Sequence, residues 1–430
     1  MNRRQNHFEA VLCNPDGTQQ VIYDERSPKY VDHLNKTFYF LEDGRCFIVR
    51  EETSTGYMHL YLYGIGQGVL HPITQGEWEV TDFVGLRGDK VYYISTESSP
   101  LKRDLYRVGL DGKHKERLTP GDGYYSIYPS ADLSYYICEG GDSSAPGRTD
   151  VFNAAGKRVR TLYDNAPLKE ALVEAGLPVR EFFTFTTERG DELNGYMLKP
   201  LDFDPAKRYP VLLTQYSGPG SQQVAEGWGP DWEDALVTHG YIVVCVDPRG
   251  TGYRGEEFKK LTYGNLGRLE VEDQISTARY MARQSYVDPA RIGIYGWSYG
   301  GFMALGCAFR GEGLFKMAIA VAPVTSWRYY DSIYTENFNG LPDDYPKGYD
   351  DNSPVNLAHL FRDDSTRLLI VHGTADDNVH FQNTMEMARA LNKLGKQYDM
   401  MVYPDQNHSM MPDDMIHVRE KMLRYTLENL

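Results

Sequence analysis

The chain has 430 residues, of which 41% are hydrophobic and 24% are charged, and its formal net charge is −15. A chain of this length exceeds what one hydrophobic core usually organises, so two domains are expected. The negative charge opposes binding to nucleic acid and to anionic membrane surfaces, so neither is expected as a partner.

Targeting signals and metal-binding patterns are not found in the sequence. No run of about 18 uncharged apolar residues occurs, and residues 1–7 have no apolar run behind their charges, so neither a membrane span nor a signal peptide is expected. The cysteines are widely spaced and form no C-x-x-C pair, so we expect no disulfide framework, no metal site and no cofactor. They are Cys13, Cys46, Cys138, Cys245 and Cys307.

The first part of the chain, residues 1–165, repeats a strand-rich pattern. Strand-like triplets begin at residues 47, 91 and 134, a spacing of 44 and then 43 residues, and each follows a turn. A period in the forties with several short strands per repeat is typical of β-propeller blades. We count about three and a half blades, fewer than the roughly 4 to 8 with which propellers close. An all-β, partial β-propeller is therefore predicted, and the chain is expected to be an N-terminally truncated form.

In residues 166–430 the pattern changes, because apolar runs now alternate with helical periodicity. The runs are Val211–Tyr216, Tyr241–Val246, Arg291–Tyr295, Met317–Val321, Leu368–Val371 and Tyr398–Tyr403. Repeated βα units predict a mostly parallel sheet with right-handed crossovers and helices on both faces.

The motif Gly296–Gly300 fits G-x-S-x-G and lies between the strand-like Arg291–Tyr295 and the helix-like Gly301–Phe309. This context predicts the nucleophile elbow of an α/β-hydrolase, in which a strained turn exposes Ser298 and the following helix offers N–H donors to an oxyanion. The alternative interpretation is a tight turn without chemistry, since glycine is frequent in this chain.

In the α/β-hydrolase fold the acid and then the histidine follow the serine, each after a later strand. Asp376 and Asp377 follow the fifth apolar run, and His408 follows the last one. An imidazole is needed to take and return the proton of Ser298, and a carboxylate to fix its tautomer. The residues alone leave Asp376 and Asp377 open, whereas His372 is assigned to the end of a strand.

Longer segments resemble the dipeptidyl peptidase IV family of the prolyl oligopeptidase clan. They include Glu270–Gln274, Gly296–Gly301, Val321–Glu336 and His372–His380, and the likeness extends over nearly the whole chain. The resemblance implies a triad of Ser298, Asp376 and His408, which selects Asp376 over Asp377.

The same resemblance implies further site residues. The oxyanion hole falls to the backbone N–H of Tyr299 and the hydroxyl of Tyr216, although Tyr216 also suits a packing role. Asn378 is expected to touch a substrate carbonyl. A pocket for proline or alanine is implied for Tyr299, Val324, Trp327, Tyr330, Tyr334 and Val379. Without the resemblance, the aromatic residues at 327, 330 and 334 would be interpreted as the core face of a helix.

The function implied is that of a serine peptidase that cleaves peptides after a proline or alanine in second position, through an acyl-enzyme. The glutamate pair and the arginine that hold the substrate N-terminus and carbonyl in relatives are not assigned here, so impaired dipeptidyl activity is expected. Alternatives are a related acylaminoacyl peptidase, oligopeptidase or esterase, and a non-catalytic propeller-hydrolase binding protein. Relatives are commonly exported and dimeric, so a homodimer and an exported parent protein are expected.

Overall fold

The computed structural model describes residues 1–176 and 178–430. The chain forms two compact units. The first comprises Met1–Ala175 with the segments Ala225–Gly229 and Gly252–Lys260, and the second comprises Gly176–Val224, Pro230–Thr251 and Leu261–Leu430. Two short segments from the second half of the chain thus cluster with the first unit.

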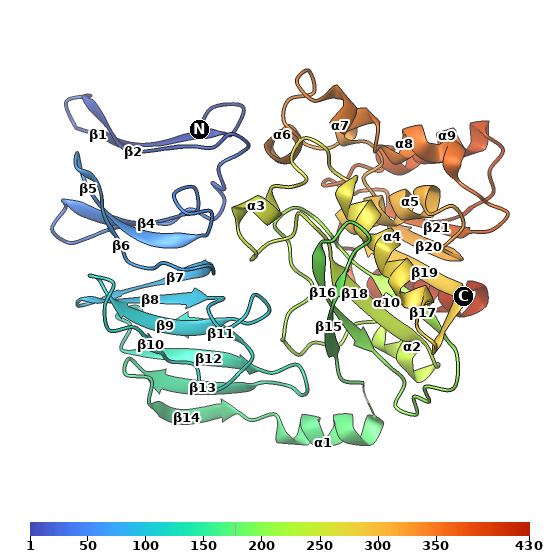
Figure 1. The fold of residues 1–430 in the computed structure, drawn as a ribbon, viewed down its shortest axis with the longest axis horizontal. Helices are drawn as coiled ribbons and strands as arrows, with labels where there is room; N and C mark the ends of the chain where they lie inside the picture. Colours follow the sequence, from blue (N-terminus) through green and yellow to red (C-terminus); the bar gives the residue numbers. More distant parts are fainter. Residues whose placement is uncertain (177) are drawn as a thin grey trace. The chain divides into compact units, whose positions relative to one another are not determined.

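The first unit is built from antiparallel sheets in chain order (Figure 1). A hairpin of β1 and β2 is followed by three four-stranded sheets, in which each strand pairs with its neighbour in the sequence. The predicted triplets fall on the second strands of these sheets, β4, β8 and β12. The strands are β1 (His7–Cys13), β2 (Gln19–Arg26), β3 (Phe38–Phe40), β4 (Cys46–Glu51), β5 (His59–Gly64), β6 (Gly68–Pro72), β7 (Val80–Arg87), β8 (Lys90–Ser95), β9 (Asp104–Gly109), β10 (Glu116–Arg117), β11 (Tyr124–Pro129), β12 (Tyr135–Gly141), β13 (Arg148–Asn153) and β14 (Arg158–Tyr163).

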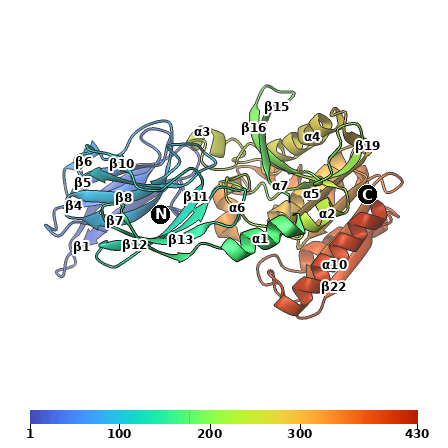
Figure 2. The same cartoon turned by 90° about the horizontal axis from the view of Figure 1, so that it is seen from below.

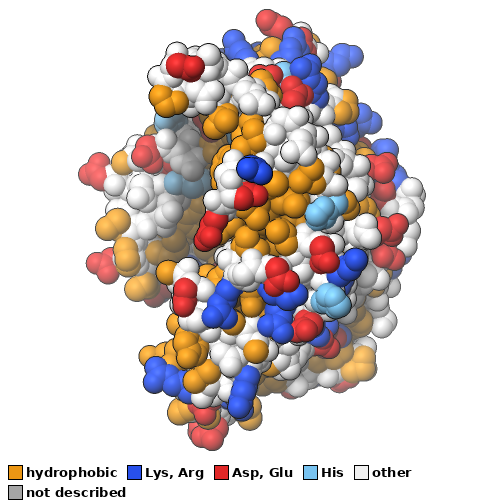
Figure 3. Space-filling view, turned by 90° about the vertical axis from the view of Figure 1, so that its left-hand side faces the viewer, with side chains coloured by type: hydrophobic (Ala, Val, Ile, Leu, Met, Phe, Trp, Pro, Cys, Tyr) orange, Lys and Arg blue, Asp and Glu red, His pale blue; other side chains and the backbone are white. Residues whose placement is uncertain are grey.

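Alternating side chains of these strands pack between neighbouring sheets and form the core of the first unit. Between the hairpin and the next sheet, the Tyr23 ring lies 5.4 Å from Phe38 and 5.3 Å from Tyr63. The next interface contains the fully buried Ile48 and Val91. Apolar side chains also remain at the surface among charged ones, and the face drawn in Figure 3 shows one larger hydrophobic area. Residues 7–163 of the first unit thus form an all-β region of stacked meanders.

The second unit contains an eight-stranded sheet with the order β15-β16-β18-β17-β19-β20-β21-β22. Its first two neighbour pairs are antiparallel, and the pairs from β18 onward are parallel. The strands are β15 (Glu181–Thr186), β16 (Glu192–Leu198), β17 (Tyr209–Thr214), β18 (Ile242–Asp247), β19 (Val287–Trp297), β20 (Met317–Val321), β21 (Arg367–Gly373) and β22 (Asp399–Tyr403). The strand order and the crossovers are those of an α/β-hydrolase.

Helices cover both faces of this sheet, with α4 and α10 on opposite sides (Figure 2). The central strands are buried because helices pack on them, which is why they are apolar at successive positions and do not alternate. The helices of the chain are α1 (Ala166–Ala175), α2 (Asp234–Thr238), α3 (Glu256–Lys259), α4 (Leu269–Ala282), α5 (Tyr299–Arg310), α6 (Ser332–Asn339), α7 (Pro346–Asp350), α8 (Pro354–Leu357), α9 (Gln382–Lys393) and α10 (Pro412–Asn429). Of these, α1 and α3 belong to the first unit. Within the described residues, no helix is both long and apolar enough to cross a bilayer.

Candidate active site

Ser298 occupies the sharp turn between β19 and α5. Its backbone has φ 61° and ψ −117°, a conformation that a residue with a side chain adopts only at a cost in strain. Its N–H donates to the Val321 carbonyl at 2.8 Å, and its carbonyl accepts from the Phe302 N–H at 3.1 Å. These two bonds hold the turn, so the side chain projects from the carboxyl edge of the sheet.

The two glycines of the motif are required by close backbone approach. A Cβ at Gly296 would lie 2.2 Å from the carbonyl oxygen of Gly300, and one at Gly300 would lie 2.6 Å from the carbonyl oxygen of Gln215. Any side chain at these positions would force the elbow open. Steric hindrance therefore explains why both of these motif positions are glycine.

Asp376 and His408 follow the adjacent parallel strands β21 and β22, so both reach the same edge of the sheet. Asp376 Oδ2 lies 2.7 Å from His408 Nδ1, and Oδ1 accepts from the N–H groups of Asn378 at 3.0 Å and Val379 at 2.9 Å. Burial alone would raise the pKa of Asp376, but hydrogen bonds from His372 and His408 outweigh burial and hold it well below its usual range. The buried carboxylate is thus ionised and faces one nitrogen of the imidazole.

Ser298 and His408 line one cavity of about 490 Å³. Tyr216 also lines this cavity, and burial raises the pKa of its phenol more than the interaction with the Ser298 side chain lowers it. The indole Nε1 of Trp297 donates to the His408 carbonyl at 3.1 Å and so ties the imidazole loop to the elbow. Asp377, the alternative acid in the sequence, is exposed and is not among the residues that line this cavity.

The predicted pocket residues gather beside the elbow. The Trp327 ring, which is only 1% exposed, lies 5.3 Å from the Tyr299 ring and within about 6 Å of the Tyr330 and Tyr334 rings. The Tyr330 hydroxyl donates to Asn378 Oδ1 at 2.6 Å. Tyr330 and Asn378 line the cavity of the nucleophile. Val324 and Val379 are also buried.

One residue of this region received no role from the sequence. Glu270, on α4, is fully buried and accepts hydrogen bonds from the Tyr299 hydroxyl at 2.6 Å and from the Gly267 N–H at 3.1 Å. Burial raises the pKa of this carboxyl to about 7, although both hydrogen bonds lower it. In the sequence, Glu270–Gln274 is informative only through the family resemblance, because a glutamate at a helix start ordinarily faces solvent.

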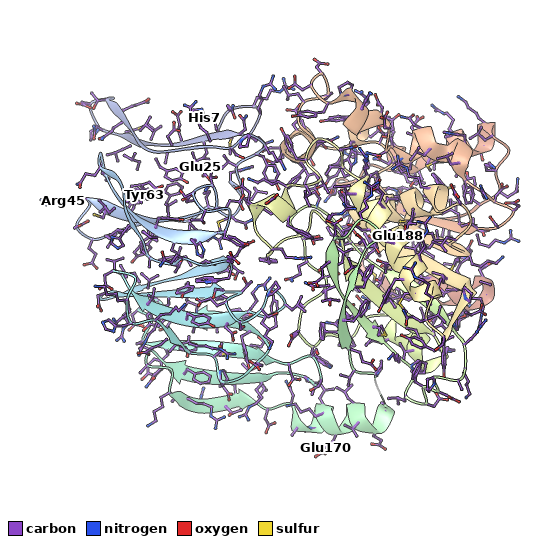
Figure 4. All side chains as sticks on the ribbon, viewed as in Figure 1. His7, Glu25, Arg45, Tyr63, Glu170 and Glu188 are labelled. Atoms are coloured by element: carbon purple, nitrogen blue, oxygen red, sulfur yellow. The ribbon has the colours of Figure 1, made fainter. Side chains whose placement is uncertain are left out.

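Among the described residues, one group of side chains has the composition and spacing of a possible metal site. Ligating atoms of His7 (labelled in Figure 4), Glu9 and Asp24 lie within 4.8 Å of one another on the β1–β2 hairpin. The three side chains are partly or fully exposed, and Asp24 is paired with Arg26 at 3.2 Å. This cluster belongs to the first unit, and we assign it no function.

Comparisons with known proteins agree with this geometry. Residues 228–430 match the prolyl oligopeptidase family, and residues 1–146 match the N-terminal region of dipeptidyl peptidase IV. The chain belongs to the dipeptidyl peptidase IV family. The resemblance found in the sequence is thereby confirmed, as is the fold of an all-β region followed by the α/β-hydrolase domain of a serine peptidase family.

Two relatives of this family are especially similar. Dipeptidyl-aminopeptidase B of Aspergillus niger is 41% identical over 366 residues, which are 83% of this chain and 40% of the relative. The crystal structure of Porphyromonas gingivalis dipeptidyl peptidase 4 superposes with a TM-score of 0.95 at 40% identity, covering 100% of this chain and 61% of that one. The chain therefore spans less than two thirds of the length of the family members it matches.

Proposed function

We propose that the second unit is a serine peptidase that releases dipeptides with proline or alanine in second position, using Ser298, His408 and Asp376. The observation that carries the proposal is the 2.7 Å contact between Asp376 Oδ2 and His408 Nδ1. His408 lines the same cavity as Ser298, the residue in the strained turn. An ionised carboxylate at Nδ1 requires the hydrogen on that nitrogen, which leaves Nε2 free to act as the base.

In the proposed reaction, the Ser298 Oγ attacks the carbonyl carbon of the second residue while His408 Nε2 takes the hydroxyl proton. The oxyanion of the tetrahedral intermediate would be stabilised by the N–H of Tyr299 and the hydroxyl of Tyr216. His408 then gives its proton to the leaving amine as the C–N bond breaks. A water molecule hydrolyses the resulting ester by the same steps in reverse.

The aromatic group around Trp327 is proposed to select the residue that precedes the cleaved bond. A proline ring is compact and apolar and lacks an N–H group, so flat aromatic walls accept it with full burial and leave no donor unpaired. Asn378 would contact a substrate carbonyl. Because Tyr330 donates to the Asn378 Oδ1, the amide nitrogen of that side chain remains the available donor.

Labelling with a fluorophosphonate tests the nucleophile. We expect the wild type to be labelled and Ser298→Ala to lose labelling, while Ser409→Ala, which changes another serine of the same cavity, stays labelled. Failure to label a correctly folded wild type would refute the proposal and favour a non-catalytic binding protein.

Substrate class is tested separately, with Gly-Pro, acetyl-Ala and short ester substrates assayed side by side. The proposal expects Gly-Pro to be preferred, and a preference for acetyl-Ala or for the esters would indicate an acylaminoacyl peptidase or an esterase. The impaired dipeptidyl activity expected from the sequence stays a prediction. Release of Gly-Pro at the rate of a full-length relative would contradict it.

A further inference from the structure

A second imidazole contacts the carboxylate of the candidate triad. His372 is the penultimate residue of β21 and is 0% exposed. Its Nε2 lies 3.1 Å from Asp376 Oδ2 and 2.8 Å from the Val379 carbonyl oxygen, and its Nδ1 lies 2.7 Å from the Thr384 hydroxyl. Both ring nitrogens therefore have hydrogen-bond partners within the protein, and the ring is not exposed to solvent.

These partners determine where the hydrogen of His372 lies. An ionised carboxylate and a carbonyl oxygen are both acceptors, so Nε2 must carry a hydrogen and share it between them. The Thr384 hydroxyl can donate to Nδ1, so the neutral Nε2–H form satisfies all three partners.

We propose that His372 is a positioning residue that holds the Asp376 carboxylate in the plane and charge state that His408 requires. The inference rests on the proposed triad. Asp376 Oδ2 accepts from both imidazoles, while Oδ1 accepts from the N–H groups of Asn378 and Val379. The four donors leave the carboxylate no free rotation. His372 also ties the Val379 carbonyl, which closes the turn from Asp376 to Val379 onto β21.

The arrangement also affects the charge that faces His408. A donor on Asp376 spreads the negative charge that stabilises the His408 imidazolium formed during the reaction, so removing that donor should change the pH dependence of kcat. Two phenols, Tyr216 and Tyr330, line the same cavity as His408, and Tyr330 comes from the loop before α6 and is close enough to Asp376 for the two to interact. Burial and the acids Asp331 and Asp376 raise the pKa of Tyr330 to about 12, so it stays neutral in the range of an activity assay.

The test compares His372→Phe, which keeps a ring but removes the donor, with His372→Gln, whose amide nitrogen can lie near the Nε2 position. We expect His372→Phe to lower kcat about 10- to 100-fold, as for loss of a hydrogen bond to a charged group, with KM nearly unchanged and the pH dependence of kcat changed. His372→Gln should recover most of kcat and the wild-type pH dependence. Tyr425→Phe on α10, which removes a partly buried hydrogen bond to Asp399 on β22, is the control for destabilisation alone and should keep wild-type kinetics.

A purely structural role would lower stability in both His372 variants without changing the pH dependence of kcat, and that result would overturn the inference. Wild-type kinetics in His372→Phe would overturn it too, while labelling of Ser298 would leave the proposed function standing. If His372→Phe does not fold, nitrogen-15 shifts of histidine in the wild type remain decisive. The inference requires a hydrogen on Nε2 and none on Nδ1 of His372 at neutral pH, and the opposite tautomer refutes it.

Discussion

The buried carboxyl of Glu270 makes the stability of the second unit dependent on pH. Its pKa is raised by burial from an ordinary 4.5 to about 7. Between these two values the folded chain holds a proton that the unfolded chain releases. The contribution of this residue to the free energy of unfolding is therefore complete below about pH 4.5, falls as the pH rises above that value, and is lost once the pH passes about 7. A difference of about 2.5 pKa units corresponds to about 3 kcal/mol.

Glu270→Gln removes this titration and keeps acceptors for the Tyr299 hydroxyl and the Gly267 N–H. We expect the variant to gain stability relative to the wild type as the pH rises from 5 to 8, by about 3 kcal/mol at most. Denaturant unfolding, followed by tryptophan fluorescence at several pH values, measures the difference. Glu420→Gln on α10, whose side chain is 57% exposed, is the control and should follow the wild-type curve. Parallel curves for Glu270→Gln and wild type would refute the reasoning.

Two further predictions concern buried charge and backbone strain. Lys259→Met should destabilise the first unit by about 3 kcal/mol in denaturant unfolding, because it removes the buried ammonium group that lies 2.7 Å from the partly buried Asp32 and 2.5 Å from the buried Glu52, which keeps the Lys260 ammonium at 2.8 Å; a loss below about 1 kcal/mol would contradict this. Ser298→Gly should be more stable than Ser298→Ala by about 1 kcal/mol, since only glycine tolerates φ 61° without strain, and equal stability would show that the elbow is relaxed.

The order of the site along the chain could be predicted because parallel strands carry their loops to one edge. Ser298, Asp376 and His408 each follow a strand, and adjacent β21 and β22 bring the last two within hydrogen-bonding distance. The partners of α4 could not be predicted. The buried Glu270 accepts a hydrogen bond from Tyr299 of another helix, and the local sequence around Glu270 does not reveal that contact.

The contact between His372 and Asp376 could not be predicted for a similar reason. A histidine at the end of an apolar strand looks like a satisfied core residue, and that description is correct as far as burial goes. Its spacing of four residues from Asp376 was the available signal. The spacing becomes informative only when the turn at Asn378 and Val379 is known to fold the carboxylate back onto the strand.

Because Gly252–Lys260 belongs to the first unit, cutting the chain after Ala175 does not separate the two units cleanly. A fragment beginning at Gly176 would still carry Lys259 and Lys260, two ammonium groups that are buried in the whole chain against Asp32 and Glu52. Separated from these acids, the segment would lose its ion pairs with Asp32 and Glu52, although Lys260 would keep its pair with Glu256. A hydrolase domain produced by a single cut after Ala175 would thus lack the acidic residues that hold the segment Gly252–Lys260 in place.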